Sequence, residues 1–198
     1  ADNSTLINCV NIGEVSGQAN GGGVLGRAGE GTVLESCGNE GTVTGADQTG
    51  GVAGTFAKTA KMTGCYNGKN GTVEGQGTAG GVIGELASQH GATAPLADCY
   101  NLGIVRGKEN AGGVIGSVTQ NLSAISGLYN AGKVYGTGEA TNTGGVIGRI
   151  SGRLKTMGGQ ITGLYNQGLV DGGQGQYTGG VFGYVGPGMG SFIRGCYN

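Results

Sequence analysis

Charge of either sign, histidine, proline and long apolar runs are all scarce in this sequence, and each scarcity excludes a class of protein. The 198 residues include 11 basic and 12 acidic side chains, one histidine and two prolines. A net charge of −1 without a basic stripe argues against a nucleic-acid partner. No apolar run approaches the ~20 residues of a membrane-spanning helix, so we expect no membrane insertion. No signal peptide is recognisable either.

Motifs for metal, nucleotide and redox chemistry are also missing. The single histidine, His90, lies in the insertion 85–98 and excludes an H-E-x-x-H zinc site. It also argues against a Ser-His-Asp triad, and we expect it to be a loop histidine. No C-x-x-C spacing, calcium-binding nonapeptide or Gly-Lys-Ser/Thr phosphate loop occurs. The sequence therefore predicts a protein that is not an enzyme, with no catalytic residue, cofactor or metal site, and it leaves any binding residues unknown.

Glycine is what the sequence has in abundance, at 50 residues. Disorder would be the simplest interpretation, but 36% of the residues are apolar and Val, Ile, Leu and Tyr recur at regular places. The recurring unit is Cys-Tyr-Asn-x-Gly-x-Val-x-Gly, a short spacer, and Gly-Gly-Val-x-Gly. Successive copies begin 28, 28, 34, 29, 36 and 32 residues apart, taken as differences between the start positions Cys9, Cys37, Cys65, Cys99, Leu128, Leu164 and Cys196.

The fixed motifs and variable spacers predict a solenoid, because stacked strands must keep register while loops at the corners can lengthen. Helical repeats are excluded, since each interior glycine costs a helix about 1 kcal/mol. We expect an all-β fold: a parallel β-helix of about six coils of 28–36 residues, with three short strands in each coil. We expect one β-solenoid domain over 1–198, as a segment of a longer chain. Alternation puts one set of valines on a single face: Val15, Val43, Val73, Val105, Val134 and Val170.

Glycines are expected where the backbone turns with positive φ or where coils approach too closely for a Cβ. Ladders of Val, Tyr and Cys/Leu are expected to be buried between coils. The Asn of the unit occurs in all seven copies and is either a row of ligand contacts or a stacked ladder at a corner. We favour the ladder, since a ligand site rarely needs seven copies. Its members are Asn11, Asn39, Asn67, Asn101, Asn130, Asn166 and Asn198.

Five cysteines share one position of the unit, where the other two copies have Leu128 and Leu164. We favour buried free thiols, because leucine replaces them and because neighbouring side chains would point in parallel, which suits a disulfide poorly. Bridges such as Cys9–Cys37 or Cys65–Cys99 are the alternative.

Carboxylates and arginines decide whether the solenoid could cleave polysaccharides. A glycosidase needs two carboxyl groups about 5–9.5 Å apart. Glu14, Glu74 and Asp171 fall in different coils and positions, so no such pair is expected. Arg27, Arg106 and Arg149 are also expected at different positions of the repeat, without forming a charged face.

The pattern NxGxVxG…GGVxG resembles the GLUG-type repeats of bacterial surface and secreted proteins, over the whole chain. Similar units occur in large adhesins and in repeat regions of some IgA1-specific metallopeptidases, whose zinc motif lies in another domain and has no counterpart here. The Cys/Leu position and the longer corners depart from the commoner pattern. The resemblance implies an extended β-helical stalk or adhesin segment outside a bacterial cell, at the cell surface or secreted.

Two functions follow as expectations. The first is a non-catalytic surface module, acting as adhesin, stalk or ligand-presenting spacer, with a host or cell-surface protein or glycan as partner. The alternative is a polysaccharide-binding or polysaccharide-cleaving β-helix resembling pectin lyases. Neither end of the sequence carries an obvious polar cap, so we also expect end-to-end self-association.

Overall fold

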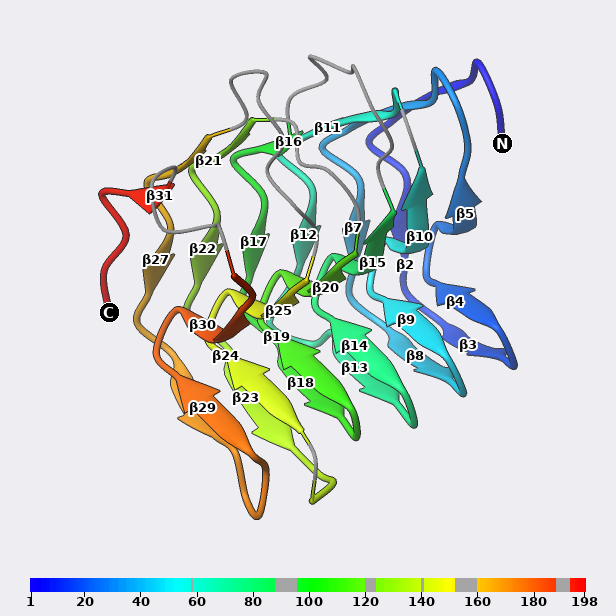
Figure 1. Cartoon of the computed structure of the whole chain (residues 1–198). Helices are drawn as coiled ribbons and strands as arrows, with labels where there is room; N and C mark the ends of the chain where they lie inside the picture. The colour runs from blue at the N-terminus through cyan, green and yellow to red at the C-terminus, as the bar shows by residue number, and fades with distance from the viewer. Residues whose placement is uncertain (58, 88–95, 120–123, 140, 152–159, 188–192) are drawn as a thin grey trace.

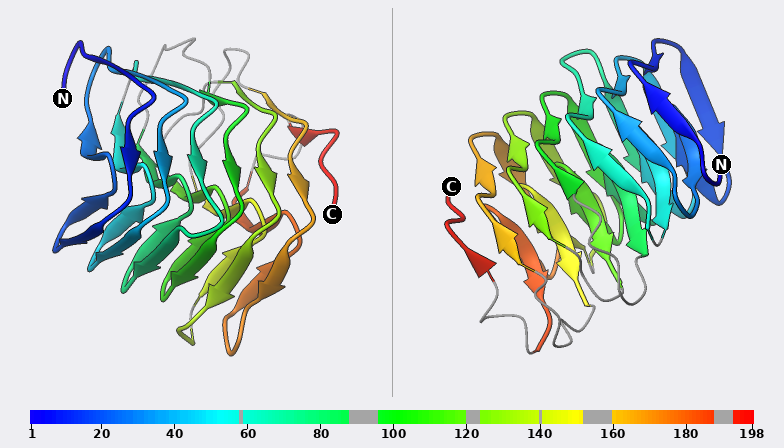
Figure 2. Two further views of the ribbon diagram at one scale, coloured as in Figure 1. Left: turned by 180° about the vertical axis from the view of Figure 1, so that it is seen from behind. Right: turned by 90° about the horizontal axis from the view of Figure 1, so that it is seen from above.

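The described chain is an all-β parallel solenoid without helices, as the repeat predicts. In this computed structural model the structure describes residues 1–57, 59–87, 96–119, 124–139, 141–151, 160–187 and 193–198. Short strands recur in the same order along the chain and stack into five sheets, each with parallel pairing. The coils lie side by side like the turns of a spring, with the two termini at opposite ends (Figures 1 and 2).

The first and second sheets follow one another in each coil and meet at a corner. The first sheet contains β1 (Thr5–Ile7), β6 (Val33–Glu35), β11 (Lys61–Thr63), β16 (Leu96–Ala97), β21 (Ile125–Ser126), β26 (Ile161–Thr162) and β31 (Ile193–Arg194). The second sheet contains β2 (Val10–Asn11), β7 (Gly38–Asn39), β12 (Tyr66–Asn67), β17 (Tyr100–Asn101), β22 (Tyr129–Asn130) and β27 (Tyr165–Asn166).

The third and fourth sheets form the long arms at the bottom of Figure 1. The third sheet contains β3 (Glu14–Gly17), β8 (Thr42–Gly45), β13 (Thr72–Gly75), β18 (Ile104–Gly107), β23 (Lys133–Gly136) and β28 (Leu169–Asp171). The fourth contains β4 (Asn20–Gly22), β9 (Gln48–Gly50), β14 (Thr78–Gly80), β19 (Asn110–Gly112), β24 (Asn142–Gly144) and β29 (Tyr177–Gly179).

The fifth sheet closes each coil. It contains β5 (Leu25–Ala28), β10 (Ala53–Ala57), β15 (Ile83–Ala87), β20 (Ile115–Val118), β25 (Ile147–Ile150) and β30 (Phe182–Val185). The spacing to the first sheet of the next coil varies: β10 ends at Ala57 and β11 begins at Lys61, whereas β15 ends at Ala87 and β16 begins at Leu96. Length variation therefore falls between strands, as expected for loops at a corner.

Each coil has five strands, so the prediction of three strands is wrong. The predicted strand through GGVxG is divided at the two glycines into fourth-sheet and fifth-sheet strands, as β24 and β25 show. The predicted strand 159–166 is divided at Gly163, whose φ is +65°. The residue at the position of Gly163 has a positive φ in all seven copies of the repeat. It is a glycine in four copies and Asn8, Ser36 or Asp98 in the other three. Asn and Asp tolerate this left-handed geometry best after glycine.

The Gly-Gly corner has a different cause, which is close packing. A Cβ on Gly81 would overlap the carbonyl oxygen of Gly113 in the next coil, and one on Gly80 would overlap the carbonyl oxygen of Ile83. Neither glycine has a positive φ. These glycines are therefore required because the backbones nearly touch, which is the second of the two predicted reasons.

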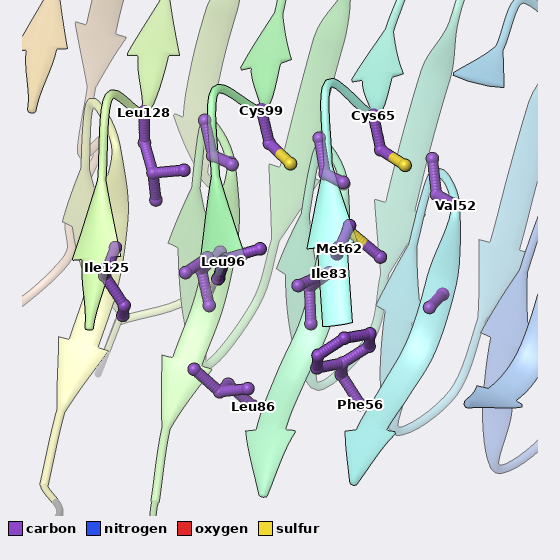
Figure 3. Close-up of a cluster of buried hydrophobic side chains, with 14 of the residues drawn as sticks. Val52, Phe56, Met62, Cys65, Ile83, Leu86, Leu96, Cys99, Ile125 and Leu128 are labelled. Atoms are coloured by element: carbon purple, nitrogen blue, oxygen red, sulfur yellow. The ribbon is translucent and has the colours of Figure 1, made fainter. Parts of the chain in front are cut away.

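The main core lies between the first, second and fifth sheets. Figure 3 shows Met62 of the first sheet and Ile83 of the fifth sheet pointing toward one another beneath Cys65. The Cys/Leu position and the first-sheet position of Met62 are fully buried in the inner coils, and one hydrophobic cluster joins them to the fifth-sheet side chains. Burial of these continuous apolar ladders is the main source of stability.

The valine register is confirmed, and the arms have their own small core. Val73 pairs with Val43 and Val105, and the same register continues to all six valines. Val73 and Val105 pack with Ala79 in a second buried cluster. The four inner valines are fully buried, whereas Val15 and Val170 in the outer coils are half-buried.

The predicted burial of the tyrosine ladder is not observed. Tyr66, Tyr100, Tyr129 and Tyr165 are only half-buried, because they alternate with the inward Cys/Leu and Asn side chains of the second sheet and therefore point outward. The ring of Tyr66 occupies the space that a side chain at Gly38 would fill. The tyrosines thus form an outer strip over the second sheet.

Candidate functional site

The recurring asparagines form the predicted structural ladder. Nδ2 of Asn67 donates to Oδ1 of Asn101 at 2.7 Å, and Nδ2 of Asn101 donates to Oδ1 of Asn130 at 2.7 Å. The same bond links every neighbouring pair of the seven, at 2.6–2.8 Å. Asn101 also exchanges hydrogen bonds with the backbone of Gly103. Since both polar atoms are engaged inside the protein, this ladder stabilises the coil rather than presenting a ligand site.

All five cysteines, each in the described part of the chain, are free. Cys37, Cys65 and Cys99 are fully buried, which confirms the prediction for these three thiols. Cys9 is exposed and Cys196 is half-buried, so the prediction that all five thiols are buried is wrong. These two residues are less buried because each has a described coil on one side only. Burial raises the pKa of Cys37 to about 11 and also raises the pKa of Cys99. Cys37 and Cys99 are therefore protonated and unreactive at neutral pH. The hydrogen bond with Cys99 instead lowers the pKa of Cys65, whose thiol is kept from reagents by its burial.

The tyrosine strip is an outward stack of aromatic rings. The rings of Tyr66 and Tyr100 lie 5.4 Å apart at 10°, and those of Tyr129 and Tyr165 lie 5.2 Å apart at 21°. The hydroxyl of Tyr129 donates to Oε1 of Gln167 at 3.0 Å. Burial raises the pKa of Tyr66, and the nearby Glu40 carboxylate raises it further by a smaller amount. Stacked rings on one strip add to the cohesion between coils.

The carboxylates considered in the sequence as a catalytic pair, Glu14, Glu74 and Asp171, do not pair with one another in the sheets. Glu14 and Glu74 each pair in register with a threonine of β8, Thr42 and Thr44, and Asp171 pairs with Tyr135. Glu74 instead forms an ion pair with Arg106 in the next coil, at 3.2 Å. No group of three or more His, Cys, Asp and Glu side chains among the described residues could hold a metal ion. His90 lies outside the described residues.

The expectation that the three arginines occupy different positions of the repeat is wrong for two of them. The register links Arg27, Thr55, Glu85, Ser117, Arg149 and Tyr184 along the fifth sheet. Arg27 and Arg149 therefore share one outward position of the unit, the residue after GGVxG, four coils apart. Arg106 lies in the third sheet, where its guanidinium is 5.1 Å from the ring of Tyr135.

A hollow of about 350 Å³ lies where the fourth and fifth sheets meet in the last two described coils. Its lining consists of Asn142, Arg149, Gln176, Tyr177 and Tyr184, which we call the Tyr177 groove. The rings of Tyr177 and Tyr184 are 5.4 Å apart and tilted by 47°. The guanidinium of Arg149 lies 5.9 Å from the ring of Tyr184. The groove thus combines two aromatic rings, one cation and two amides.

A second, larger hollow of about 750 Å³ lies at the tips of the arms, with Lys108, Glu109 and Glu139 among its lining residues. Its charges are mixed, and it contains no aromatic side chain among the described lining residues. It offers less specific chemistry than the Tyr177 groove.

Sequence reasoning missed the Tyr177 groove because it searched the invariant positions. The available signal was the variable residue after GGVxG, together with the residue two before the Gly-Gly pair. These positions carry polar or charged side chains in the first five copies and Tyr184 and Tyr177 in the sixth. No described segment forms a helix that could cross a membrane. Comparison with known protein families, with curated proteins and with solved structures finds no match to this chain.

Proposed function

We propose that this chain is a non-catalytic β-solenoid module of a bacterial cell-surface or secreted protein, acting as an adhesin, stalk or ligand-presenting spacer. The observation that carries the proposal is the asparagine ladder, which runs without interruption from Asn11 to Asn198. Its side-chain hydrogen bonds join each described coil to the next through equivalent residues, so all these coils stack in the same register. A stack held in this way is a rigid rod whose outward positions are free to vary.

The resemblance to GLUG-type repeats supports the same proposal. It implies a location outside a bacterial cell, where an extended rod can hold a binding surface away from its anchor. Host or cell-surface glycans and proteins are the corresponding partners. The Tyr177 groove favours the glycan among them, since its aromatic and amide side chains are suited to sugars.

A glycan array combined with a reducing-sugar release assay tests this function. The expected result is binding to at least one glycan class, without new reducing ends after prolonged incubation with the bound polysaccharide. Release of reducing ends that scales with protein concentration would favour the alternative, a polysaccharide-cleaving β-helix. Protease treatment of intact source cells, followed by recovery of peptides from this chain, tests the surface location.

A further inference from the structure

The Tyr177 groove is the last part of a longitudinal corner that runs beside all the described coils. One wall is formed by the first residues of the fourth-sheet strands, and the other by the outward residues of the fifth sheet. The two walls meet: the hydroxyl of Thr55 donates to Oδ1 of Asn20 in the preceding coil. In the middle coils the corner is filled, because Thr78, Asn110 and Ser117 are each at most 7% exposed.

The corner is exposed at both ends of the described stack, at Asn20 and Arg27 in the first coil and at Tyr177 in the sixth, and only the sixth coil carries aromatic side chains there. Tyr177 and Tyr184 replace the small polar residues of the middle coils, and Tyr177 is 43% exposed. Their rings are tilted by 47° to one another, and Tyr177 provides the more exposed ring, since Tyr184 is half-buried beside Arg149. Tyr177 belongs to neither buried hydrophobic cluster, and a ligand that packs on its ring is a reason for an aromatic side chain at this exposed position.

The polar groups of the groove are available to a ligand. Among the described residues the one ion pair joins Arg106 to Glu74, so Arg149 has no carboxylate partner there. Nδ2 of Asn142 donates to Oδ1 of Asn110 at 2.8 Å, which fixes the amide and leaves its own Oδ1 as an acceptor. Arg149 is the one charged residue in the described lining. A guanidinium held beside an aromatic face binds planar carboxylates through two parallel hydrogen bonds.

We propose that the Tyr177 groove binds a pyranose sugar that carries a carboxylate, such as a uronic acid or a sialic acid within a glycan. The apolar face of the sugar ring packs on Tyr177 and Tyr184, and the carboxylate pairs with Arg149. The amides of Asn142 and Gln176 hydrogen-bond the hydroxyl groups. A volume of about 350 Å³ lies at the small end of ligand pockets, which fits one or two sugar rings. This inference rests on the proposed function and specifies its ligand.

Isothermal titration of the full chain with acidic and neutral sugars tests the proposal. The acidic probes are trigalacturonate and sialyllactose, and the matched neutral probes are fully methyl-esterified trigalacturonate and lactose. We expect at least one acidic probe to bind at least tenfold more tightly than its neutral counterpart, about 1.4 kcal/mol. Sodium acetate should bind far more weakly than the acidic sugar. The proposal fails if neither acidic probe binds, if the neutral counterpart binds equally well, or if acetate matches the acidic sugar.

Variants locate the site. Arg149→Gln and Tyr184→Ala should each weaken binding at least tenfold, whereas Tyr184→Phe, which keeps the ring, should bind within about twofold of the parent. Arg27→Gln is the matched control, because Arg27 shares the position of Arg149 in a coil without the tyrosines. Unchanged circular dichroism and Tm show that each variant is folded. Equal losses in Arg27→Gln and Arg149→Gln would overturn the assignment to this groove.

The same samples separate this inference from the proposed function. Release of reducing ends from a bound acidic polysaccharide, with binding abolished by Arg149→Gln, would refute the non-catalytic function and support the sugar site. Binding of the array glycans without any acidic sugar among them would refute the sugar site and leave the adhesin function supported.

Discussion

Replacing Asn101 by aspartate is the sharpest test of the asparagine ladder, because it changes one atom and removes the side chain's donors. Asn101 is fully buried. Its Nδ2 donates to Oδ1 of Asn130 at 2.7 Å and to the carbonyl of Gly103 at 3.4 Å, and its Oδ1 accepts from Asn67 at 2.7 Å. A carboxylate keeps the accepted bond but places an oxygen against Oδ1 of Asn130. Two acceptors lose a donor inside the protein.

The expected destabilisation follows from these lost bonds. Oδ1 of Asn130 keeps the hydrogen bond from the backbone N–H of Gly132, and the carbonyl of Gly103 keeps the one from the N–H of Lys133. The two lost hydrogen bonds are worth about 1–3 kcal/mol together, and the buried carboxylate held against an oxygen adds to this cost at pH 7. The neutral acid can donate to Asn130, and burial also favours it, so the folded-state pKa of the new carboxyl is raised above its unfolded value of about 3.9. Stability relative to the parent should therefore be nearly restored below about pH 3.9, and it should be lost as the pH rises through the folded-state pKa.

Urea melts of the parent and Asn101→Asp at several pH values between 3.5 and 7.5 measure this effect, with tyrosine fluorescence and circular dichroism as probes. Asn11→Asp is the control: Asn11 occupies the first described coil and is only half-buried, so its loss of stability should be smaller and less dependent on pH. A difference between Asn101→Asp and the parent that stays constant across this range would refute the reasoning. So would a difference below about 1 kcal/mol at pH 7, the net value of an ordinary hydrogen bond.

Three further predictions concern the core, the corners and the thiols. Val105→Asp should unfold the protein, since it buries an unpaired carboxylate, whereas Arg106→Ala should cost less than about 1 kcal/mol because it removes a partly exposed ion pair; equal thermal melts of the two variants would contradict the register. Gly81→Ala should lower Tm by several degrees through overlap with the next coil, and an unchanged Tm would show that the corner can relax. A thiol reagent should react with two cysteines in the native protein and with five after denaturation; five rapid equivalents in the native protein would contradict burial of Cys37, Cys65 and Cys99.

Much of the fold could be predicted because equivalent residues recur in every copy of the repeat, and these residues pair with one another when the coils stack. Val73, Val105 and their counterparts recur at one place in each copy, so alternation identified an inward face that the strand pairing confirms. The asparagine ladder followed from the same reasoning. A repeated polar side chain must satisfy its hydrogen bonds in each coil, and its neighbours in the stack are copies of itself.

The strand count could not be predicted in the same way. Gly163 and the Gly-Gly pair interrupt apolar stretches that look continuous in the sequence, and the sequence does not show whether a glycine there turns the chain or only lets another backbone approach. The Tyr177 groove was missed for a related reason. Its residues come from two coils and from positions that do not repeat, and the depth of the corner depends on how the fourth and fifth sheets meet.

The asparagine ladder also has a direction. Every amide in it donates toward the C-terminal coil and accepts from the N-terminal one, so the side-chain dipoles add along the solenoid axis as peptide dipoles do in a helix. Wherever such a stack is cut, one face presents unpaired oxygens and the other presents unpaired amide hydrogens. Two identical faces cannot satisfy each other. A solenoid of this kind can therefore be extended or repaired only head to tail, by a coil that carries its asparagine in the same orientation.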